Sequence, residues 1–390
     1  MKITGYHAFF VALPSRRPHN WATKMHEPIG RHYILKLETD AGIEGWGETP
    51  PLATWGGPHG MYYGETLGTV DHVIREYLFP AIKGQDPREI AYCHMRMDSA
   101  IKGHPYAKAA VDLALHDIAG KAAGTPVYRL LGGKLRDAIP VCHSLGIMDV
   151  EAAVEEAEHA AQEGVTTIKC KTGLDPERDV TLVRMLRERL GHRIAIRTDA
   201  NEGYPTPWDA VRVIRRMEPY EILLHEQPVA GFEALAEVSR AVPAPIMADE
   251  SAWFPQDILR LWELKAASMI SVYYAKPGGL YRARQVIDVA KACGFLCDIG
   301  GSIEMGIGVA ANLHLAASTE ILACASVCPV PNVDGEGPTR IAGVYYVDDI
   351  IRTPLRYEEG FLQVPDGPGL GVEVDDRKIA KYATWSRREG

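Results

Sequence analysis

The hydrophobic and polar positions of the chain follow two different rhythms. In the first 50 residues, the stretches ITGYHAFFVAL, RHYILKLETD and IEGWGE predict three strands of a meander, with the turn DAGIEG between the last two. Helical patterns follow at about 63–79, 87–101 and 105–124, and the last of them ends at glycine with Pro126 just beyond. The opening third therefore mixes sheet and helix without strand–helix–strand alternation.

From about residue 138, short apolar runs alternate with amphipathic helical segments. Eight strand candidates follow one another: IPVCHSLG, TTIKCK, IAIRTDAN, ILLHEQP, APIMADES, MISVYYAK, FLCDIGGS and ILACASVCPV. This alternation predicts a (β/α) barrel. An open doubly wound sheet is the alternative, although no GxGxxG fingerprint opens a helix. The rhythm is lost after about residue 345, so we expect the tail to return to the opening domain.

Composition is typical of an ordinary globular protein and limits the classes of partner that the chain is expected to bind. It is 46% hydrophobic and 24% charged, and no apolar run approaches the length of a membrane span. The net charge of −9 disfavours nucleic acid and anionic membranes as partners. Seven scattered cysteines without a CxxC pair favour reduced thiols. The N-terminus lacks a signal-peptide cleavage site, so we expect a cytoplasmic protein.

Charged residues recur at the ends of five consecutive strand candidates. Lys171, Asp199, Glu226, Asp249 and Lys276 follow one another at spacings of 28, 27, 23 and 27 residues, each about one βα unit. In a barrel the carboxyl ends of the strands converge on one mouth, where such enzymes hold their active sites. Any one of these residues alone is typical of a solvated, salt-bridged or helix-capping position. Their common register favours a site.

Three converging carboxylates repel one another unless a cation lies among them. Oxygen ligands from separate strands suit Mg²⁺ or Mn²⁺. Lys169 and Lys171 share one face of their strand, about 7 Å apart at Cα. We expect the metal and Lys169 to lower the pKa of Lys171, so that Lys171 acts as a general base.

At these residues the chain resembles the enolase superfamily, in the muconate cycloisomerase (muconate lactonizing enzyme)-like branch of the mandelate racemase/muconate lactonizing enzyme family. The resemblance covers nearly the whole chain. Its motifs are Lys169-Cys170-Lys171, Asp199-Ala200-Asn201, Glu226-Gln227-Pro228, Asp249-Glu250-Ser251, Lys276 before Gly278-Gly279, GGSIEMGIG, ALHDIAGKAAGTPVYRLLGG and GPGLGVEVD.

The resemblance implies a fold and a set of site residues. The fold is α/β, a modified TIM barrel (β/α)7β at 131–344 with an N-terminal α+β capping domain at 1–130 that about 345–390 completes. Strand parity does not choose Asp249 over Glu250 as a ligand, whereas the resemblance does. The implied roles are metal ligands for Mg²⁺ or Mn²⁺ (Asp199, Glu226 and Asp249), acid/base groups on opposite faces of the substrate (Lys171 and Lys276), an assisting cation (Lys169), and residues that support the ligands (Asn201, Glu250 and Glu304).

The implied activity is that of an isomerase that removes the α-proton of a small carboxylic acid to give a metal-stabilised enediolate. Racemisation or epimerisation and muconate-type cycloisomerisation use these parts. A syn-dehydratase and a metal-free Schiff-base lyase with Lys276 or Lys171 as nucleophile are the alternatives. Strand eight ends in VCPVPNVDG, without the acidic residues of the dipeptide epimerases, which argues against a dipeptide substrate. Tyr274 stands where many relatives carry another lysine.

Two loops of the capping domain are expected to close over the site. PSRRPHNWATKMHEPIG carries Arg16, Arg17, His19, Lys24 and His26, and PPLATWGGPHGMYYG carries Trp55 and His59. The cations suit a second anionic or polar group of the substrate, and Trp55 suits an apolar part, unless these are ordinary solvated loops. The expected partners are a small-molecule carboxylate and further copies of the chain in a homo-oligomer. The candidate substrate-binding residues are His26, Lys24, Trp55 and Ser144.

Overall fold

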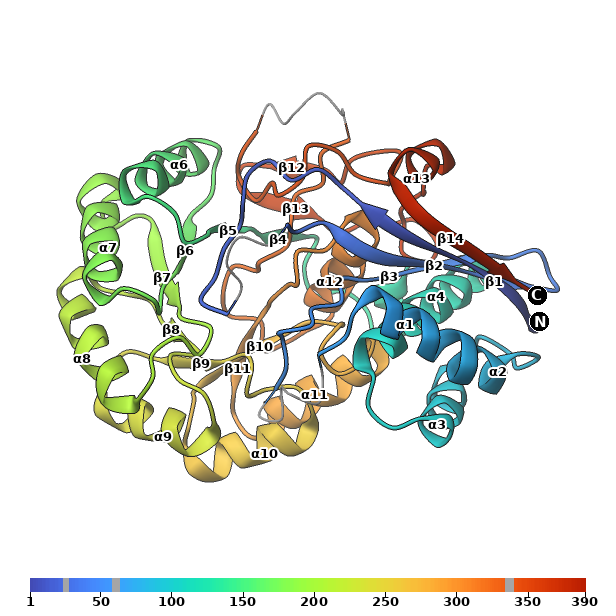
Figure 1. Cartoon of the computed structure of the whole chain (residues 1–390), viewed down its shortest axis with the longest axis horizontal. Coiled ribbons are helices and arrows are strands. Elements are labelled where there is room, and N and C mark those ends of the chain that lie inside the picture. The colour runs from blue at the N-terminus through green and yellow to red at the C-terminus, as the bar shows by residue number, and fades with distance from the viewer. Residues whose placement is uncertain (24–27, 58–63, 334–339) are drawn as a thin grey trace.

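The structure is a computed structural model that describes residues 1–23, 28–57, 64–333 and 340–390. The expected residues Lys24, His26 and His59 lie outside these ranges. Figure 1 shows an arc of strands with helices outside it and, beside it, a smaller sheet with its own helices. The two chain ends lie next to each other on the smaller sheet.

The larger sheet has seven parallel strands in sequence order, so each strand pairs with the one before it along the chain. The sheet contains β5 (Cys142–Leu145), β6 (Thr167–Lys171), β7 (Ala195–Asp199), β8 (His225–Glu226), β9 (Ile246–Ala248), β10 (Met269–Val272) and β11 (Leu296–Ile299). The connecting helices are α6 (Val150–Gln162), α7 (Pro176–Leu190), α8 (Pro207–Met217) with the 3-10 turn η3 (Glu218–Tyr220), α9 (Phe232–Ala241), α10 (Pro255–Leu264) and α11 (Leu280–Ala292), and α12 (Gly306–Ala317) follows β11. This arrangement confirms the barrel and excludes the open doubly wound sheet.

The eighth strand expected at ILACASVCPV is wrong as a regular element. The segment forms only isolated bridges in the described chain, from Leu322 to Cys297 and from Ser326 to Val141. These bridges place the segment between β11 and the start of β5, at the position where the last strand of a barrel closes the ring. The backbone N–H of Cys142 donates to Ser326 O at 2.8 Å, so the apolar run fills its place in the barrel without a continuous ladder.

The smaller sheet is antiparallel and combines both ends of the chain. Its order is β14 (Ala383–Glu389), β1 (Ile3–Ala12), β2 (Arg31–Thr39) and β3 (Gly45–Thr49). The helices beside it are α1 (Leu67–Val73), the π-helical turn η2 (Ile74–Leu78), α2 (Phe79–Ile82), α3 (Ile90–Ala100) and α4 (Pro105–Ala123). The short α5 (Val127–Leu130), a small sheet of β4 (Ala138–Pro140), β13 (Phe361–Gln363) and β12 (Tyr357–Glu358), and α13 (Asp376–Tyr382) complete the fold.

Local sequence explains where the barrel helices begin and how the cap packs. The Asp175 side chain accepts from the N–H groups of Glu177 and Arg178, and Pro176 occupies the first helical position of α7. In the cap, α4 lies so close to β3 that a Cβ on Gly47 would meet Ala110 O at 1.8 Å. Only glycine permits that approach.

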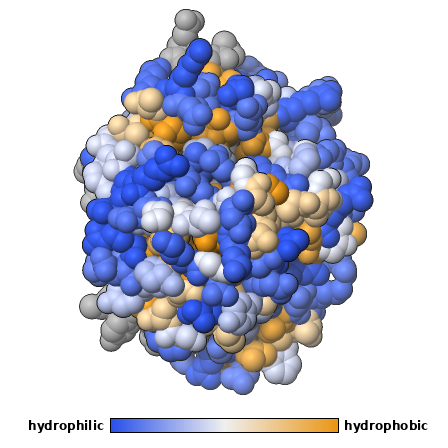
Figure 2. All heavy atoms as spheres, turned by 90° about the vertical axis from the view of Figure 1, so that its right-hand side faces the viewer, coloured by the Kyte–Doolittle hydropathy of each residue, from blue (hydrophilic) through white to orange (hydrophobic). Residues whose placement is uncertain are grey.

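The surface of the capping domain is mainly polar. The face of the capping domain in Figure 2 is mainly hydrophilic, with separate apolar patches. Within the described ranges, no helix has the length and apolar character needed to cross a bilayer. All seven cysteines are unpaired.

Candidate active site

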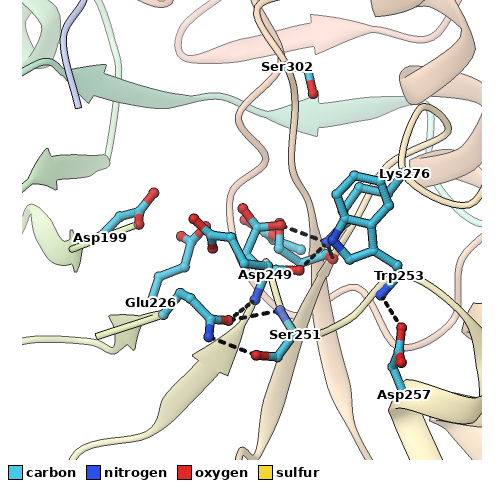
Figure 3. A network of polar contacts seen from close by, with 12 residues as sticks. Asp199, Glu226, Asp249, Ser251, Trp253, Asp257, Lys276 and Ser302 are labelled. Carbon is cyan, nitrogen blue, oxygen red and sulfur yellow. Dashed lines mark hydrogen bonds and ion pairs between the residues drawn. The ribbon is translucent and has the colours of Figure 1, made fainter. Parts of the chain in front are cut away.

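The carboxyl ends of neighbouring strands bring the predicted acidic residues together. Lys171, Asp199 and Glu226 are the last residues of β6, β7 and β8, and the register pairs Lys171 with Asp199 and Asp199 with Glu226. Asp249 directly follows the last residue of β9. Paired residues of adjacent parallel strands point to the same side of a sheet, and Figure 3 shows Asp199, Glu226 and Asp249 around one space.

Lys276 joins this group, but not as the last residue of its strand. The expectation that it ends the sixth strand is wrong, because β10 stops at Val272 and Lys276 lies in the following turn. The chain leaves the sheet there because Gly279 N donates back to Tyr274 O at 2.8 Å and Gly279 takes a φ of 123°. Lys276 Nζ then donates to Asp249 Oδ1 at 2.6 Å and to Ser271 O at 2.7 Å (Figure 3).

The lysines and carboxylates form a buried ionic network. Lys169 Nζ lies between two carboxylates, 2.9 Å from Asp199 Oδ2 and 2.8 Å from Glu226 Oε1. Lys171 Nζ donates to Asp199 Oδ2 at 2.6 Å and to Asn201 Oδ1 at 2.7 Å. The repulsion between the two neighbouring lysines is therefore offset by shared carboxylates.

Burial and the charged partners shift the pKa values of Lys169, Glu226 and Asp199 in different directions. Burial alone would lower the pKa of Lys169, but Asp199 and Glu226 outweigh it and raise that pKa. Burial raises the pKa of Glu226 to about 7, helped by Asp199 and opposed by Lys169. Burial also acts to raise the pKa of Asp199, but Lys169 and Lys171 outweigh it and the pKa is lowered. Lys169 thus remains a fixed cation beside the carboxylates.

The donor chemistry of the three carboxylates fits a hard divalent cation. All three groups offer oxygen, and Glu250 Oε2 beside them is buried without a hydrogen-bond partner in the described residues. In the described ranges, however, no three metal-ligating side chains are gathered tightly enough to hold a metal ion. The ammonium groups of Lys169 and Lys276 lie against the carboxylates instead.

The residues expected to support the ligands differ in what they contact. Asn201 accepts from Lys171 and donates from Nδ2 to Glu250 Oε1 at 2.9 Å, so it links Lys171 to Glu250. Glu304 instead accepts from the N–H of Ser302 at 2.8 Å, and burial raises its pKa to about 8. Glu304 therefore fixes a wall of the cavity, and within the described residues it forms no hydrogen bond with the three carboxylates.

Three supporting residues had no assigned role in the sequence analysis. Gln227 Oε1 accepts from Asp249 N at 2.9 Å and from Ser251 N, which fixes the segment after β9. Glu202 has a pKa raised to about 7 by burial and by Asp249. Arg197 is fully buried under the site, 2.7 Å from Asp298 and 3.7 Å from Glu226. The motif around Gln227 was visible in the sequence, but its hydrogen bonds were not.

A cavity opens above the network, and several aromatic side chains line it together with polar and aliphatic residues. Trp55 and Ser144, two of the candidate substrate-binding residues, line it. Trp21, Tyr273 and Tyr345 also line it, and they were not predicted. The Trp21 ring lies 5.9 Å from Lys171 Nζ and the Tyr273 ring lies 4.9 Å from Lys276 Nζ, distances typical of cation–π contacts. The cavity also contacts His19, Leu52, Lys169, Lys171, Asn201, Asp249, Ser271, Gly300, Gly301, Ser302, Ile303 and Val327.

The two arginines of the first loop are not available to a substrate. Arg16 Nη2 lies 2.7 Å from Glu156 Oε1, and Arg17 donates to both oxygens of the same carboxylate. The expectation that these cations meet a second anionic group is therefore wrong for Arg16 and Arg17. Sequence alone does not reveal the pairing because Glu156 lies 139 residues beyond Arg17.

Comparison with known proteins places this fold and site in a family. Residues 7–132 match the mandelate racemase / muconate lactonizing enzyme N-terminal domain, and residues 152–378 match the enolase C-terminal domain-like family. The N-succinyl-L-Arg/Lys racemase of Bacillus cereus is 32% identical over 387 residues, 99% of each chain. Muconate cycloisomerase 1 of Rhodococcus opacus is 32% identical over 397 residues, again 99% of each chain.

A solved structure agrees with these matches. The crystal structure of N-succinyl Arg/Lys racemase from Bacillus cereus superposes with a TM-score of 0.91 at 30% identity and covers 100% of both chains. The L-Ala-D/L-Glu epimerase of Clostridium acetobutylicum is 29% identical over 367 residues, so the relatives include a racemase, a cycloisomerase and an epimerase. The chain therefore belongs to the enolase superfamily, in the muconate lactonizing enzyme-like branch of the mandelate racemase/muconate lactonizing enzyme family, and is an isomerase.

Proposed function

We propose that the protein interconverts the stereoisomers of an α-substituted carboxylic acid by removing and returning its α-proton. One observation carries the proposal: two lysines lie at the cavity from strands that are far apart in the sheet. Lys171 lines the cavity, and Lys276 lies against Asp249 and Tyr273, which line it. Lys171 ends β6 and Lys276 follows β10, with β7, β8 and β9 between those strands. A racemase needs one proton-transfer group on each face of the α-carbon, and this placement supplies two.

The lysines and the fixed cation have separate tasks in this proposal. Lys171 and Lys276 each take the proton from one stereoisomer and return it to the other. Lys169, held charged between Asp199 and Glu226, orients the substrate carboxylate and balances the charge that develops on it. The aromatic rings of Trp21 and Tyr273 exclude water beside the two acid/base groups.

Enzymes of this family generally depend on a metal ion. We assign Asp199, Glu226 and Asp249 as its ligands and Mg²⁺ as the ion, because all three ligands offer hard oxygen donors. A dipeptide epimerase of Cytophaga hutchinsonii, 26% identical with a TM-score of 0.89, was solved in complex with Mg and a dipeptide. A divalent cation bound there would stabilise the negative charge on the substrate carboxylate after the α-proton leaves.

Deuterium exchange tests the two-base assignment. Acid sugars, N-acyl amino acids, hydroxyprolines and muconates are screened for α-proton exchange in D₂O by proton NMR. On the acid that exchanges, Lys276→Ala should exchange only one stereoisomer and Lys171→Ala only the other, because each variant keeps one base. Lys291→Ala, an exposed lysine paired with Glu320, is the control and should exchange both stereoisomers.

Other outcomes identify other reactions on the same scaffold. If both variants are silent toward both stereoisomers, or if one keeps near-normal turnover, the two-base proposal fails and a one-base cycloisomerase or dehydratase takes its place. Loss of water from the substrate identifies the dehydratase. Irreversible inactivation by borohydride only with substrate, without any effect of chelators, identifies the Schiff-base lyase.

A further inference from the structure

Helix α11 follows directly on the turn that carries Lys276, and the capping domain holds its first residues. In the described chain α11 has no side-chain cap of its own, because its N-cap residue is Gly279, and its first turn contains no acidic residue. The N–H groups at the start of a helix need acceptors from elsewhere. Asp112 of α4 supplies them from 168 residues away: Leu280 N donates to its Oδ2 at 2.6 Å and Tyr281 N to its Oδ1 at 3.4 Å.

Two histidines fix the carboxylate of Asp112. His94 Nε2 lies 2.7 Å from its Oδ1, and His116 Nδ1 lies 3.1 Å from its Oδ2. The carboxylate is fully buried. Burial acts to raise the pKa of Asp112, but His116 and His94 outweigh it and the pKa is lowered, so the group is an anion. An anion is favoured at the amino end of a helix, where the helix dipole is positive.

Gly279 joins this contact to the turn around Lys276. A Cβ on Gly279 would lie 2.1 Å from Asp112 Cγ, so only glycine lets the carboxylate approach. Gly279 N donates to Tyr274 O at 2.8 Å, which closes the turn that contains Lys276. The same glycine therefore closes the turn and rests on the side chain of Asp112.

The next residues of α11 are held by the capping domain as well. The ring of His94 stacks on Tyr281, with the centroids 4.9 Å apart. Asp98 of α3 pairs with Arg282 and accepts from Lys108 Nζ at 2.8 Å. Residues 280–282 thus all contact α3 or α4, whereas β10 already stops at Val272 and its ladder does not hold the turn.

These contacts give the capping domain a second role beside covering the cavity. Lys276 Nζ must lie where Asp249 Oδ1 accepts from it at 2.6 Å (Figure 3), and the turn that sets this position ends at Asp112. We propose that Asp112 is a positioning residue, whose carboxylate anchors the start of α11 and thereby places Lys276 for proton transfer. The inference rests on the proposed function for the task of Lys276 and on the contacts of Asp112 for the anchor.

Helix α4 offers a matched control in Asp117. This residue is also buried, and its Oδ1 accepts from Leu370 N at 2.9 Å. A Cβ on Gly369, the residue before Leu370, would lie 2.2 Å from the same oxygen. Asp117 therefore makes the same kind of contact from the same helix, but it holds the C-terminal segment and not α11.

Exchange of each stereoisomer measures the effect on Lys276. The acid that exchanges in the D₂O screen is used with Mg²⁺ present, and Lys276→Ala and Lys171→Ala identify which stereoisomer depends on which lysine. Asp112→Ala should lower kcat for the Lys276-dependent stereoisomer about 10- to 100-fold and leave the other stereoisomer and both KM values within about twofold, because only one base is displaced. Asp117→Ala should keep the wild-type ratio of the two rates.

Amide hydrogen exchange of the protein without substrate gives a readout that does not depend on the reaction. In Asp112→Ala the amides of Leu280 and Tyr281 should exchange at least about tenfold faster than in wild type, because they lose their acceptor. In Asp117→Ala they should exchange as in wild type. Asp112→Asn keeps one acceptor oxygen and should lie between wild type and Asp112→Ala in both measurements. If an alanine variant fails to fold, Asp112→Asn and Asp117→Asn make the same comparison.

The remaining outcomes separate this inference from the proposed function. An equal loss for both stereoisomers in Asp112→Ala, the same selective loss in Asp117→Ala, or unchanged amide exchange at Leu280 and Tyr281 would overturn the inference. Faster amide exchange in Asp112→Ala, together with a slower reaction whose stereoisomers do not divide between the two lysines, would support the anchor of Lys276 and overturn the two-base reaction instead.

Discussion

Ionisation of Glu48 is expected to destabilise the wall of the cavity. Glu48 lies on β3 and is fully buried between the cap and α12. Its carboxyl accepts from the N–H of Met305 at 2.6 Å and of Gly308 at 2.8 Å, and His32 Nδ1 lies 2.7 Å away. Burial raises the pKa of Glu48 to about 8 even though the two N–H groups oppose it. Met305 lies two residues after Ile303, a residue of the cavity wall.

The sign and size of the effect follow from this shift. Because the folded protein holds the Glu48 proton more tightly than the unfolded chain, the stabilisation is present below about pH 4.5 and is lost as the pH rises through about 8. Each pKa unit corresponds to about 1.4 kcal/mol. Between about pH 5.5 and 8 the free energy of unfolding should therefore fall by about 3 kcal/mol through this group.

Glu48→Gln tests this reasoning because an amide cannot ionise. Urea unfolding at the two pH values, without divalent cations, gives the free energy of unfolding of each protein. Wild type should lose about 3 kcal/mol more than Glu48→Gln over this range, whatever the baseline stability of the variant. Glu44→Gln, on an exposed side chain of the same domain, is the control and should follow wild type. Parallel pH dependences of wild type and Glu48→Gln would refute the reasoning.

Three further predictions concern the site. Chelation should abolish activity and Mg²⁺ should restore it, while Asp249→Asn should raise the Mg²⁺ concentration needed; full activity of a metal-free preparation would contradict this. Arg197→Met should lower the free energy of unfolding by about 3–5 kcal/mol by leaving Asp298 unpaired, and Asp298→Leu should recover part of the loss in urea unfolding; additive losses would contradict the pairing. The rate constant kcat/KM should rise with pH because the attacking lysine must be neutral, and Lys169→Met should move that limb; a flat profile between about pH 6 and 10 would count against it.

The sequence by itself determined the repeating architecture and the polar ends of its strands. Apolar runs alternate with amphipathic segments, and each βα unit carries one charged residue at the same point, as at Lys171, Asp199 and Glu226. These features are local. The period of the apolar residues determines whether a segment is a strand or a helix, and the length of one βα unit determines the spacing of the charged residues. Because the strands are parallel, their carboxyl ends lie at one edge of the sheet, and the charged residues at those ends come together there. The family resemblance rests on the same residues.

Local patterns did not reveal where the regular structure stops. The run ILACASVCPV is as apolar as a strand, yet its backbone forms bridges and not a ladder. Lys276 continues the alternation of its strand in the sequence, but the chain turns away after Val272. In the run ILACASVCPV, tertiary hydrogen bonds to distant backbone outweigh the local preference for an extended strand. After Val272, the turn in which Gly279 N donates to Tyr274 O ends the strand.

Only the tertiary structure decided which charges are free and which are satisfied. In the sequence, Arg17 and His19 are both candidate cations. In the structure, Glu156 neutralises Arg17, and Arg17 fixes His19 as a neutral donor. Glu48 reads as an ordinary strand residue, but it holds the start of a helix more than 250 residues away. Charge and hydrogen bonding at a buried site depend on groups that the fold brings within a few ångströms. Because such partners come from anywhere in the chain, their pairing follows from the closed fold and not from any local pattern.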